Sequence, residues 1–233
     1  MAAELIAHLS RFITAERLSR MRQVLAERTR YLTVAVEDIY QPHNASAVLR
    51  TCDSFGVQDV HVIENRNRYR INPGVELGTA QWLTLHRYRG AANNTPEAIG
   101  TLRDAGYRIV ATTPHTNDVA LDCFDLEAGP AALLFGNELD GLSAEAISLE
   151  DEHLVIPMHG FVESLNISVC AAVVLYHLTH RLRASGIAYH PSPEEQDEIM
   201  LCWLRSSIGR APALEREYFA RNRQNRETQE NQS

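Results

Sequence analysis

The chain has 233 residues, of which 45% are hydrophobic and 22% charged, so it is long enough to bury a core without disulfide or metal staples. It contains no run of about 18 apolar residues, which excludes a membrane-spanning helix, and its start does not resemble a secretory signal. Acidic residues outnumber basic ones by 30 to 22, which argues against a generally basic nucleic-acid-binding protein. We therefore expect a cytoplasmic protein with no membrane partner.

Hydrophobic periodicity predicts strands that alternate with helices along most of the chain. In chain order, the sequence predicts a helix over residues 5–28, a strand over 32–39, a helix over 45–55, strands over 60–63 and 82–88, a helix over 95–106, strands over 107–113, 131–135 and 154–158, a helix over 164–183, and one or two helices over 194–226. Asn44 is expected to cap the second helix, and the Thr95 hydroxyl is expected to cap the third.

This order of elements predicts the fold class. Several strands are apolar along their whole length, which is typical of a parallel sheet with helices on both faces, and the chain is therefore expected to be an α/β protein. We expect an N-terminal helical arm over residues 1–30, a core over 31–186, and a C-terminal helical arm over 187–233. The polar end at 225–233 is expected to be disordered.

The basic residues gather in three groups, and all 22 of them are arginines. The groups are Arg11, Arg17, Arg20, Arg22, Arg28 and Arg30 near the start, Arg66, Arg68 and Arg70 in a loop, and Arg205, Arg210, Arg216, Arg221, Arg223 and Arg226 near the end. Because salt confines electrostatic attraction to about 10 Å, local basic arms on an acidic body can still bind phosphates. An Arg-rich helical arm is as often a solvated face, so the pattern alone leaves both interpretations open.

Several common site motifs are absent from the sequence. No G-x-G-x-x-G follows the first strand, and a P-loop is impossible without lysine. Ser164 is not part of a G-x-S-x-G nucleophile turn. The four cysteines lie far apart and the ten histidines show no metal-ligand spacing, so we expect reduced thiols and no metal site.

Three segments place polar residues where a strand passes into a loop, which is where open parallel sheets build ligand sites. The first segment is residues 42–50, in which Asn44 at the helix start and Arg50 nearly two turns later are expected to face one cleft. Taken alone, this pair is explained more simply by a helix cap and a salt bridge.

The other two segments follow the strands at 131–135 and 154–158. In residues 133–143, Gly136 permits close backbone approach to a flat ligand, and Glu138 offers a carboxylate at the strand end. In residues 156–168, Ser164 and Asn166 precede a long helix, whose free N–H groups can hold an anion. Each segment alone fits an ordinary turn, but three of them in this order indicate a ligand site.

Together the segments resemble the three motifs of the SpoU class of the SPOUT superfamily. These are RNA ribose 2′-O-methyltransferases that depend on S-adenosyl-L-methionine (AdoMet). The resemblance covers roughly residues 15–185. The run Leu-Thr-Val-x-x-Glu before Pro-His-Asn44 further resembles the TrmH branch, which methylates a guanosine ribose in the tRNA D-loop.

This resemblance implies a deep trefoil knot in the C-terminal part of the core, which is rare among proteins. It also implies a homodimer with the active site at the subunit interface. The AdoMet-binding residues that it implies are Thr112, Gly136, Ile156 and Leu165. The catalytic residues that it implies are Asn44, Arg50, Glu138, Ser164 and Asn166.

The chemistry fits these residue types. AdoMet carries its own electrophile, so the reaction requires no metal, and the protein has to align and deprotonate a ribose hydroxyl. Because arginine stays protonated in proteins, we expect Arg50 to position a phosphate and the hydroxyl, with the general base left open. The resemblance to the TrmH branch therefore implies methylation of a D-loop guanosine in tRNA. The alternatives are a 2′-O-methyltransferase for rRNA or another tRNA position, and an RNA-binding protein without catalysis.

Overall fold

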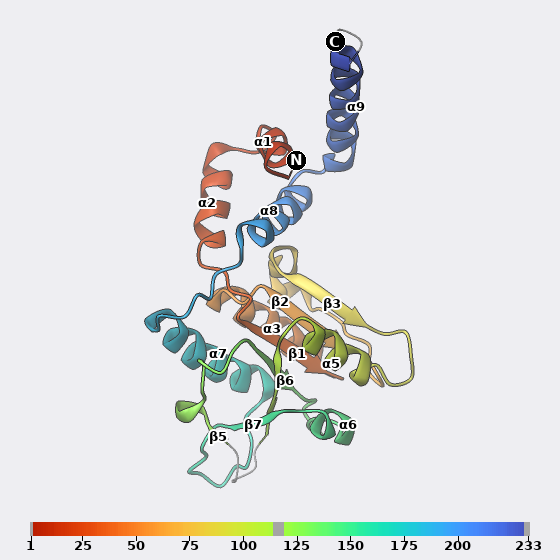
Figure 1. Cartoon of the computed structure of the whole chain (residues 1–233). Coiled ribbons are helices and arrows are strands. Elements are labelled where there is room, and N and C mark those ends of the chain that lie inside the picture. Colours follow the sequence, from red (N-terminus) through yellow and green to blue (C-terminus); the bar gives the residue numbers. More distant parts are fainter. Residues whose placement is uncertain (1, 114–118, 231–233) are drawn as a thin grey trace. The chain divides into compact units, whose positions relative to one another are not determined.

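The computed structural model describes residues 2–113 and 119–230, with side chains described as far as residue 223. The chain divides into two compact units, shown in Figure 1. One unit is Arg28–His190, and the other combines Met1–Glu27 with Pro191–Ser233. The two terminal arms, expected as separate segments, are thus parts of one helical unit.

The larger unit is built on one seven-stranded parallel sheet. Its strands are β1 (Leu32–Glu37), β2 (Asp59–Ile63), β3 (Thr84–Tyr88), β4 (Arg108–Thr112), β5 (Val119–Ala120), β6 (Ala131–Phe135) and β7 (Glu152–Val155). They lie in the order β3-β2-β1-β6-β4-β7-β5. The predicted parallel sheet is confirmed, while β5, at two residues, is too short for a periodicity to predict.

Helices cover both faces of this sheet, as predicted (Figure 1). The helices of this unit are α3 (Pro42–Phe55), α4 (Pro73–Glu76), α5 (Thr95–Asp104), α6 (Ala144–Ser148) and α7 (Ile167–Ala184), with 3-10 turns η1 (Thr79–Trp82) and η2 (Leu121–Cys123). Because side chains alternate along a strand, Leu133 of β6 joins the core formed with α3 and α7, whereas Leu134 joins the core formed with α5 and α6.

Two predicted helix caps are wrong, and both residues have other partners. Helix α3 begins three residues early because Pro42, which lacks an N–H, occupies its first turn, and Asn44 therefore lies inside the helix. Helix α5 is preceded by Asn94, and the Thr95 hydroxyl instead donates to the buried carboxylate of Glu37. For Thr95, a contact with a distant strand end decided the outcome, and local sequence does not reveal such a contact.

The second unit is helical. It contains α1 (Ala2–Ser10), α2 (Ala15–Leu25), α8 (Pro193–Ser207) and α9 (Ala211–Glu230). The single helix expected over residues 5–28 is divided, because Thr14 caps α2 by accepting from the N–H of Arg17 at 3.2 Å. Helix α1 packs on α8 and α9, and α2 packs on α8. The end expected to be disordered is helical as far as Glu230, where Arg, Gln and Glu favour a helix, and residues 231–233 lie outside the described part.

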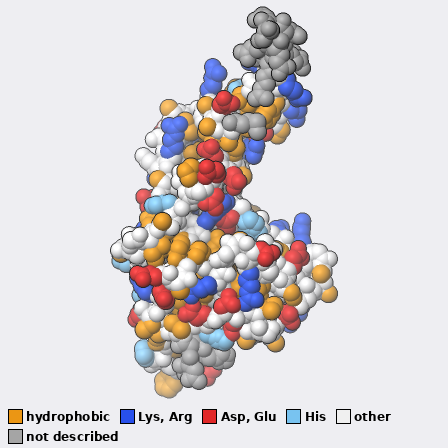
Figure 2. All heavy atoms as spheres, viewed as in Figure 1, with side chains coloured by type: hydrophobic (Ala, Val, Ile, Leu, Met, Phe, Trp, Pro, Cys, Tyr) orange, Lys and Arg blue, Asp and Glu red, His pale blue; other side chains and the backbone are white. Residues whose placement is uncertain are grey.

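Two arginines of the N-terminal group form ion pairs within the sheet unit. Arg28 is fully buried and pairs with Asp53, and Arg30 pairs with Asp59 at 2.9 Å. Both belong to the sheet unit. Of the helical unit's arginines, Arg20 and Arg22 are exposed, and blue side chains stand out along this unit in Figure 2.

No helix within the described residues is both long and apolar enough to cross a bilayer.

Candidate active site

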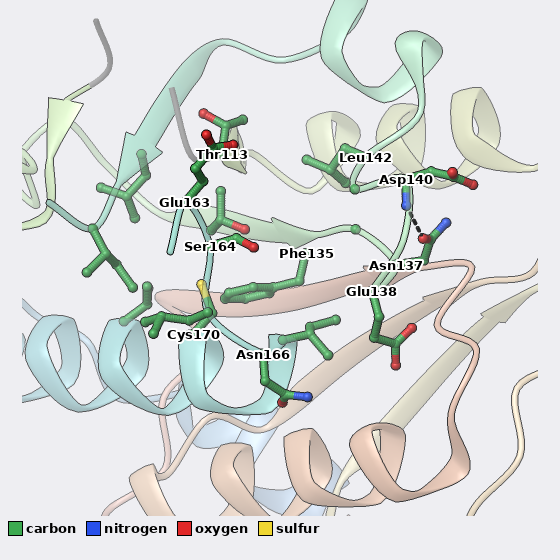
Figure 3. A pocket seen from close by; sticks show the side chains of 18 of the residues that line it. Thr113, Phe135, Asn137, Glu138, Asp140, Leu142, Glu163, Ser164, Asn166 and Cys170 are labelled. Atoms are coloured by element: carbon green, nitrogen blue, oxygen red, sulfur yellow. Dashed lines mark hydrogen bonds between the residues drawn. The ribbon is translucent and has the colours of Figure 1, made fainter. Parts of the chain in front are cut away.

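A cavity of about 570 Å³ lies where β4, β6 and β7 end (Figure 3). Its walls come from three loops and the start of α7, which is the position where parallel sheets form ligand sites. All four predicted AdoMet-binding residues line it, namely Thr112, Gly136, Ile156 and Leu165. Three of the predicted catalytic residues line it as well, namely Glu138, Ser164 and Asn166.

Two further wall residues were not singled out from the sequence, because buried apolar residues look alike there. Phe135, at the end of β6, and Cys170, on the first turn of α7, form an apolar wall. Burial raises the pKa of the Cys170 thiol to about 11, so the thiol is neutral at physiological pH. This wall suits a flat organic group better than an ion.

Glu138 connects the cavity to the start of α3. One carboxylate oxygen accepts from Asn44 Nδ2 at 2.7 Å, and the other accepts from the backbone N–H of Tyr40 at 3.2 Å. The backbone N–H of Gln41 also donates to Glu138, at 3.4 Å, to the same oxygen that accepts from Asn44. A single half-buried carboxylate therefore joins the loop after β6 to the loop after β1.

Asn44 carries this connection on to the third loop. It is buried, with 3% of its surface exposed, and its Oδ1 accepts from Asn166 Nδ2 at 3.3 Å. Asn166 is the N-cap of α7, because its own Oδ1 accepts from the backbone N–H of Ser168 at 2.9 Å. The three side chains form one hydrogen-bonded chain across the three predicted motifs. Ser164 lies two residues before this cap, on the cavity wall (Figure 3).

Gly136 is required by the backbone around it. A Cβ at this position would lie 2.0 Å from the carbonyl carbon of Gly141 and 2.1 Å from the nitrogen of Leu142. The group that approaches Gly136 closely is therefore the backbone of the same chain, at Gly141 and Leu142. The loop turns back in this way because Asn137 and Gly141 exchange two backbone hydrogen bonds of 3.0 and 3.2 Å.

The sequence analysis expected Arg50 and Asn44 to face one cleft. Within a single chain this prediction is wrong. Its guanidinium is exposed, does not line the cavity, and donates to the backbone oxygen of Val75 in α4 at 3.2 Å. Six residues advance a helix by about 600°, so the two side chains project from different sides of α3.

Glu37, the acid of the Leu-Thr-Val-x-x-Glu run, supports the site without lining the cavity. It is buried at the end of β1 and accepts from the hydroxyl of Thr95 and from both the N–H and the hydroxyl of Ser143. It thereby fixes the starts of α5 and α6. In the sequence, Glu37 is recognisable as an acid at the end of a mostly apolar strand.

Within the described residues, no cluster of three or more His, Cys, Asp or Glu side chains is arranged to hold a metal ion. What the site offers is an apolar wall, a backbone cradle at Gly136, and a chain of amide and carboxylate groups at one side. This arrangement can bind a flat organic molecule and orient a polar group next to it.

Comparison with known proteins agrees with this description. The SpoU rRNA Methylase family matches residues 31–176. The tRNA (guanosine(18)-2'-O)-methyltransferase of Borreliella burgdorferi is 43% identical over 203 residues, which is 87% of this chain and 91% of that protein.

Two solved structures are also similar. The A. aeolicus TrmH/SpoU tRNA modifying enzyme matches with a TM-score of 0.73 and 31% identity, over 83% of this chain and 97% of the other. The SpoU methyltransferase AviRb from Streptomyces viridochromogenes, in complex with the cofactor AdoMet, matches with a TM-score of 0.58 and 25% identity, over 70% and 65% of the chains. By sequence and by fold, this chain belongs to the SpoU rRNA Methylase family.

Proposed function

We propose that this protein transfers a methyl group from AdoMet to the ribose 2′-hydroxyl of guanosine 18, in the D-loop of tRNA. The observation that carries the proposal is the cavity at the ends of β4, β6 and β7, where all four predicted AdoMet-binding residues meet Glu138, Ser164 and Asn166. The choice of tRNA is supported by the name of the Borreliella burgdorferi relative. We propose that the reaction takes place in the cytoplasm, which a tRNA substrate supports.

The cavity fits AdoMet in shape and chemistry. Its volume of about 570 Å³ is within the usual range for cofactor sites, and Phe135 and Cys170 provide an apolar wall for a flat ring. When bound, AdoMet supplies a methyl group that is already activated. Thr112, Gly136, Ile156 and Leu165, which all line the cavity, would hold the cofactor.

The chain's own residues then orient the nucleophile. We assign the Glu138–Asn44–Asn166 chain to holding the three loops in register, so that Ser164 stands beside the reacting groups. Alignment of this kind can lower a barrier by several kcal/mol. Arg50 is assigned to holding a substrate phosphate and the hydroxyl, because a guanidinium keeps its proton.

The active form is proposed to be a homodimer with its site at the subunit interface. An apolar stripe along α7 supports this, since Val169, Val173 and Tyr176 are 47%, 37% and 59% exposed and lie three or four residues apart. Arg50 lies on α3, which packs against α7, and points away from the cavity of its own chain. In the dimer, Arg50 would serve the cavity of the partner.

The deep trefoil knot belongs to the same proposal. It is supported by the family membership and by the similarity to the A. aeolicus enzyme over 97% of that chain. In a knotted chain the segment from β6 to α7 would pass through a loop of the core, which would hold the three loops of the cavity together.

The experiment that tests the function is transfer of labelled methyl from AdoMet to unmodified tRNA and to rRNA, followed by mapping of the modified nucleotide. We expect 2′-O-methylguanosine in the D-loop. Methylation of rRNA, which the family description names, or of another tRNA nucleotide would replace the substrate assignment. Binding of RNA without methylation of either would favour the RNA-binding protein without catalysis.

A further inference from the structure

The loop after β2 displays three arginines on one side. Arg66, Arg68 and Arg70 are exposed, whereas Asn67 between them is partly buried and Tyr69 is buried. The alternation turns every second side chain outward, so the arginines form a basic strip. These three arginines have no role in the methyl transfer as proposed above.

A buried carboxylate holds the first part of the loop in place. Asp38 lies at the end of β1 with a φ of 52°, and its Oδ1 accepts from the backbone N–H groups of Asn65 at 2.7 Å and Arg66 at 2.8 Å. The N–H of Asn67 donates to the same oxygen at 3.2 Å. A left-handed φ is costly for a residue other than glycine, and here it aims one carboxylate at three successive N–H groups.

The second part of the loop is fixed as well. The backbone N–H of Tyr69 donates to Glu64 at 2.7 Å, and that of Asn72 donates to the hydroxyl of Ser46 in α3 at 2.7 Å. The loop is thus anchored on both sides of Arg68 and Arg70. Because the loop is already ordered before a ligand binds, the entropic cost of binding is lower.

The strip lies beside the cavity at one end and leads toward α4 at the other. At one end, Arg66 Nη2 lies 3.3 Å from Asp140 Oδ2, and Asp140 lines the cavity. At the other end, Val75 in α4 accepts from Arg50. Because Arg66 contacts a residue of the cavity wall, RNA that enters the cavity would lie next to this strip.

Charge identifies the kind of group that the strip would bind. Across the described part of the chain, neither Arg68 nor Arg70 forms an ion pair or hydrogen bond, although the protein carries a net charge of −8. Arg66 pairs with Asp38 and Asp140 while 64% of its side chain is exposed. Guanidinium groups that are fixed in place and left to solvent suit the planar, bidentate recognition of phosphate.

We propose that Arg66, Arg68 and Arg70 bind the backbone phosphates of the substrate RNA beside the nucleotide whose ribose is methylated. This rests on the proposed function and deepens it, because it gives the sheet unit its own RNA contact in addition to any made by the helical unit. Such contacts position the substrate and carry no sequence information.

The test uses the full-length protein with Arg68→Gln, Arg70→Gln and the double variant. Arg103→Gln is the matched control, since it removes one exposed positive charge from α5, where the arginine pairs with Asp151. Binding of an unmodified tRNA transcript is measured over a range of salt concentrations, together with the affinity for AdoMet. Arg68→Lys combined with Arg70→Lys tests whether charge alone restores binding.

We expect the double variant to weaken tRNA binding about tenfold near physiological salt, and to reduce the slope of log K against log salt by about 2. AdoMet affinity, the thermal midpoint and kcat at saturating tRNA should equal those of the parent, and Arg103→Gln should bind tRNA as the parent does. Equal salt slopes for the double variant and the parent would overturn the proposal.

The two proposals can fail separately. If the parent methylates tRNA and the double variant is indistinguishable from it, the strip is excluded and the proposed function stands. If the parent binds tRNA without methylating it, and the double variant loses the salt-dependent part of that binding, the strip stands and the proposed function is excluded.

Discussion

Glu138 is the residue on which the geometry of the site depends most. It accepts hydrogen bonds from Asn44 and from the backbone of Tyr40 and Gln41, and so connects the loop after β6 to the start of α3. A charged acceptor that receives several donors strengthens each bond.

Glu138→Ala should therefore impair both catalysis and stability. The variant leaves Asn44 without its acceptor, which costs about 1–3 kcal/mol, and we expect kcat/KM to fall by more than about tenfold as the loops lose their register. Steady-state methylation kinetics and urea unfolding measure the two effects. Full activity in the variant would remove Glu138 from the mechanism.

His61 is a second residue with a measurable consequence, although it lies away from the cavity. It is buried on β2, stacked on His86 at 4.4 Å between ring centroids, with its Nδ1 2.9 Å from the hydroxyl of Tyr88. Burial, and next the neighbouring His86, lower its pKa from 6.5 to about 4, and Asp59 opposes the shift.

This shift predicts a pH dependence of stability with a defined sign. The unfolded chain binds a proton at His61 below pH 6.5 and the folded chain only near pH 4, so the folded state loses stability as the pH falls through this window. The full effect is about 3 kcal/mol. Urea unfolding at several pH values should show a shallower decline for His61→Gln than for the parent. Parallel curves would contradict the assignment.

At the scale of elements, the sequence predicted strands better than helix ends. Strands β1 and β6 are buried along their whole length, and their mostly apolar runs mark them without any tertiary information. Helix starts depend on distant partners, as Thr95 shows by bonding Glu37 instead of capping α5. The residues of the cavity were predicted through the three motifs, whereas the side of α3 from which Arg50 projects depends on where that helix begins.

The turn after β6 gives the sharpest test at this scale. Gly136→Ala places a Cβ against the backbone of Gly141, so the loop that lines the cavity has to move, and we expect AdoMet affinity to fall by more than about tenfold. Gly100→Ala in α5 is the control, because nothing lies within 4 Å of its new Cβ.

The two glycine variants should change stability in opposite directions. Gly100→Ala should stabilise the protein by about 0.5–1 kcal/mol, since alanine favours a helix, while AdoMet affinity stays at the parental value. Calorimetric titration with AdoMet and thermal unfolding give both quantities. A Gly136→Ala variant that binds AdoMet as the parent does would show that the loop does not form the cofactor site.

At the scale of the whole molecule, the chain forms a helical unit and a sheet unit. The terminal segments could be predicted as helical from periodicity, but their association into one unit rests on packing of α1 against α8 and α9, between segments far apart in sequence. The exposed stripe on α7 could not be predicted from periodicity either. Apolar residues lie both on this stripe and on the sides of α7 that pack on the core, so the sequence does not distinguish them.

The proposed dimer makes a prediction at this scale. Val173→Asp places a charge in the middle of the α7 stripe, so we expect a monomer in sedimentation or light scattering and loss of methyl transfer. Gln replacement of exposed Glu97 in α5 is a matched surface control that should leave the dimer intact. A parent that is monomeric and active would exclude an interface site.

The central claim is that this protein methylates the ribose 2′-hydroxyl of one D-loop guanosine in tRNA. The most direct measurement compares two tRNA transcripts that differ only at this guanosine, one with ribose and one with 2′-deoxyribose. The account predicts methyl transfer from labelled AdoMet to the first transcript and none to the second, with equal binding of both. Equal methylation of the two transcripts would contradict it.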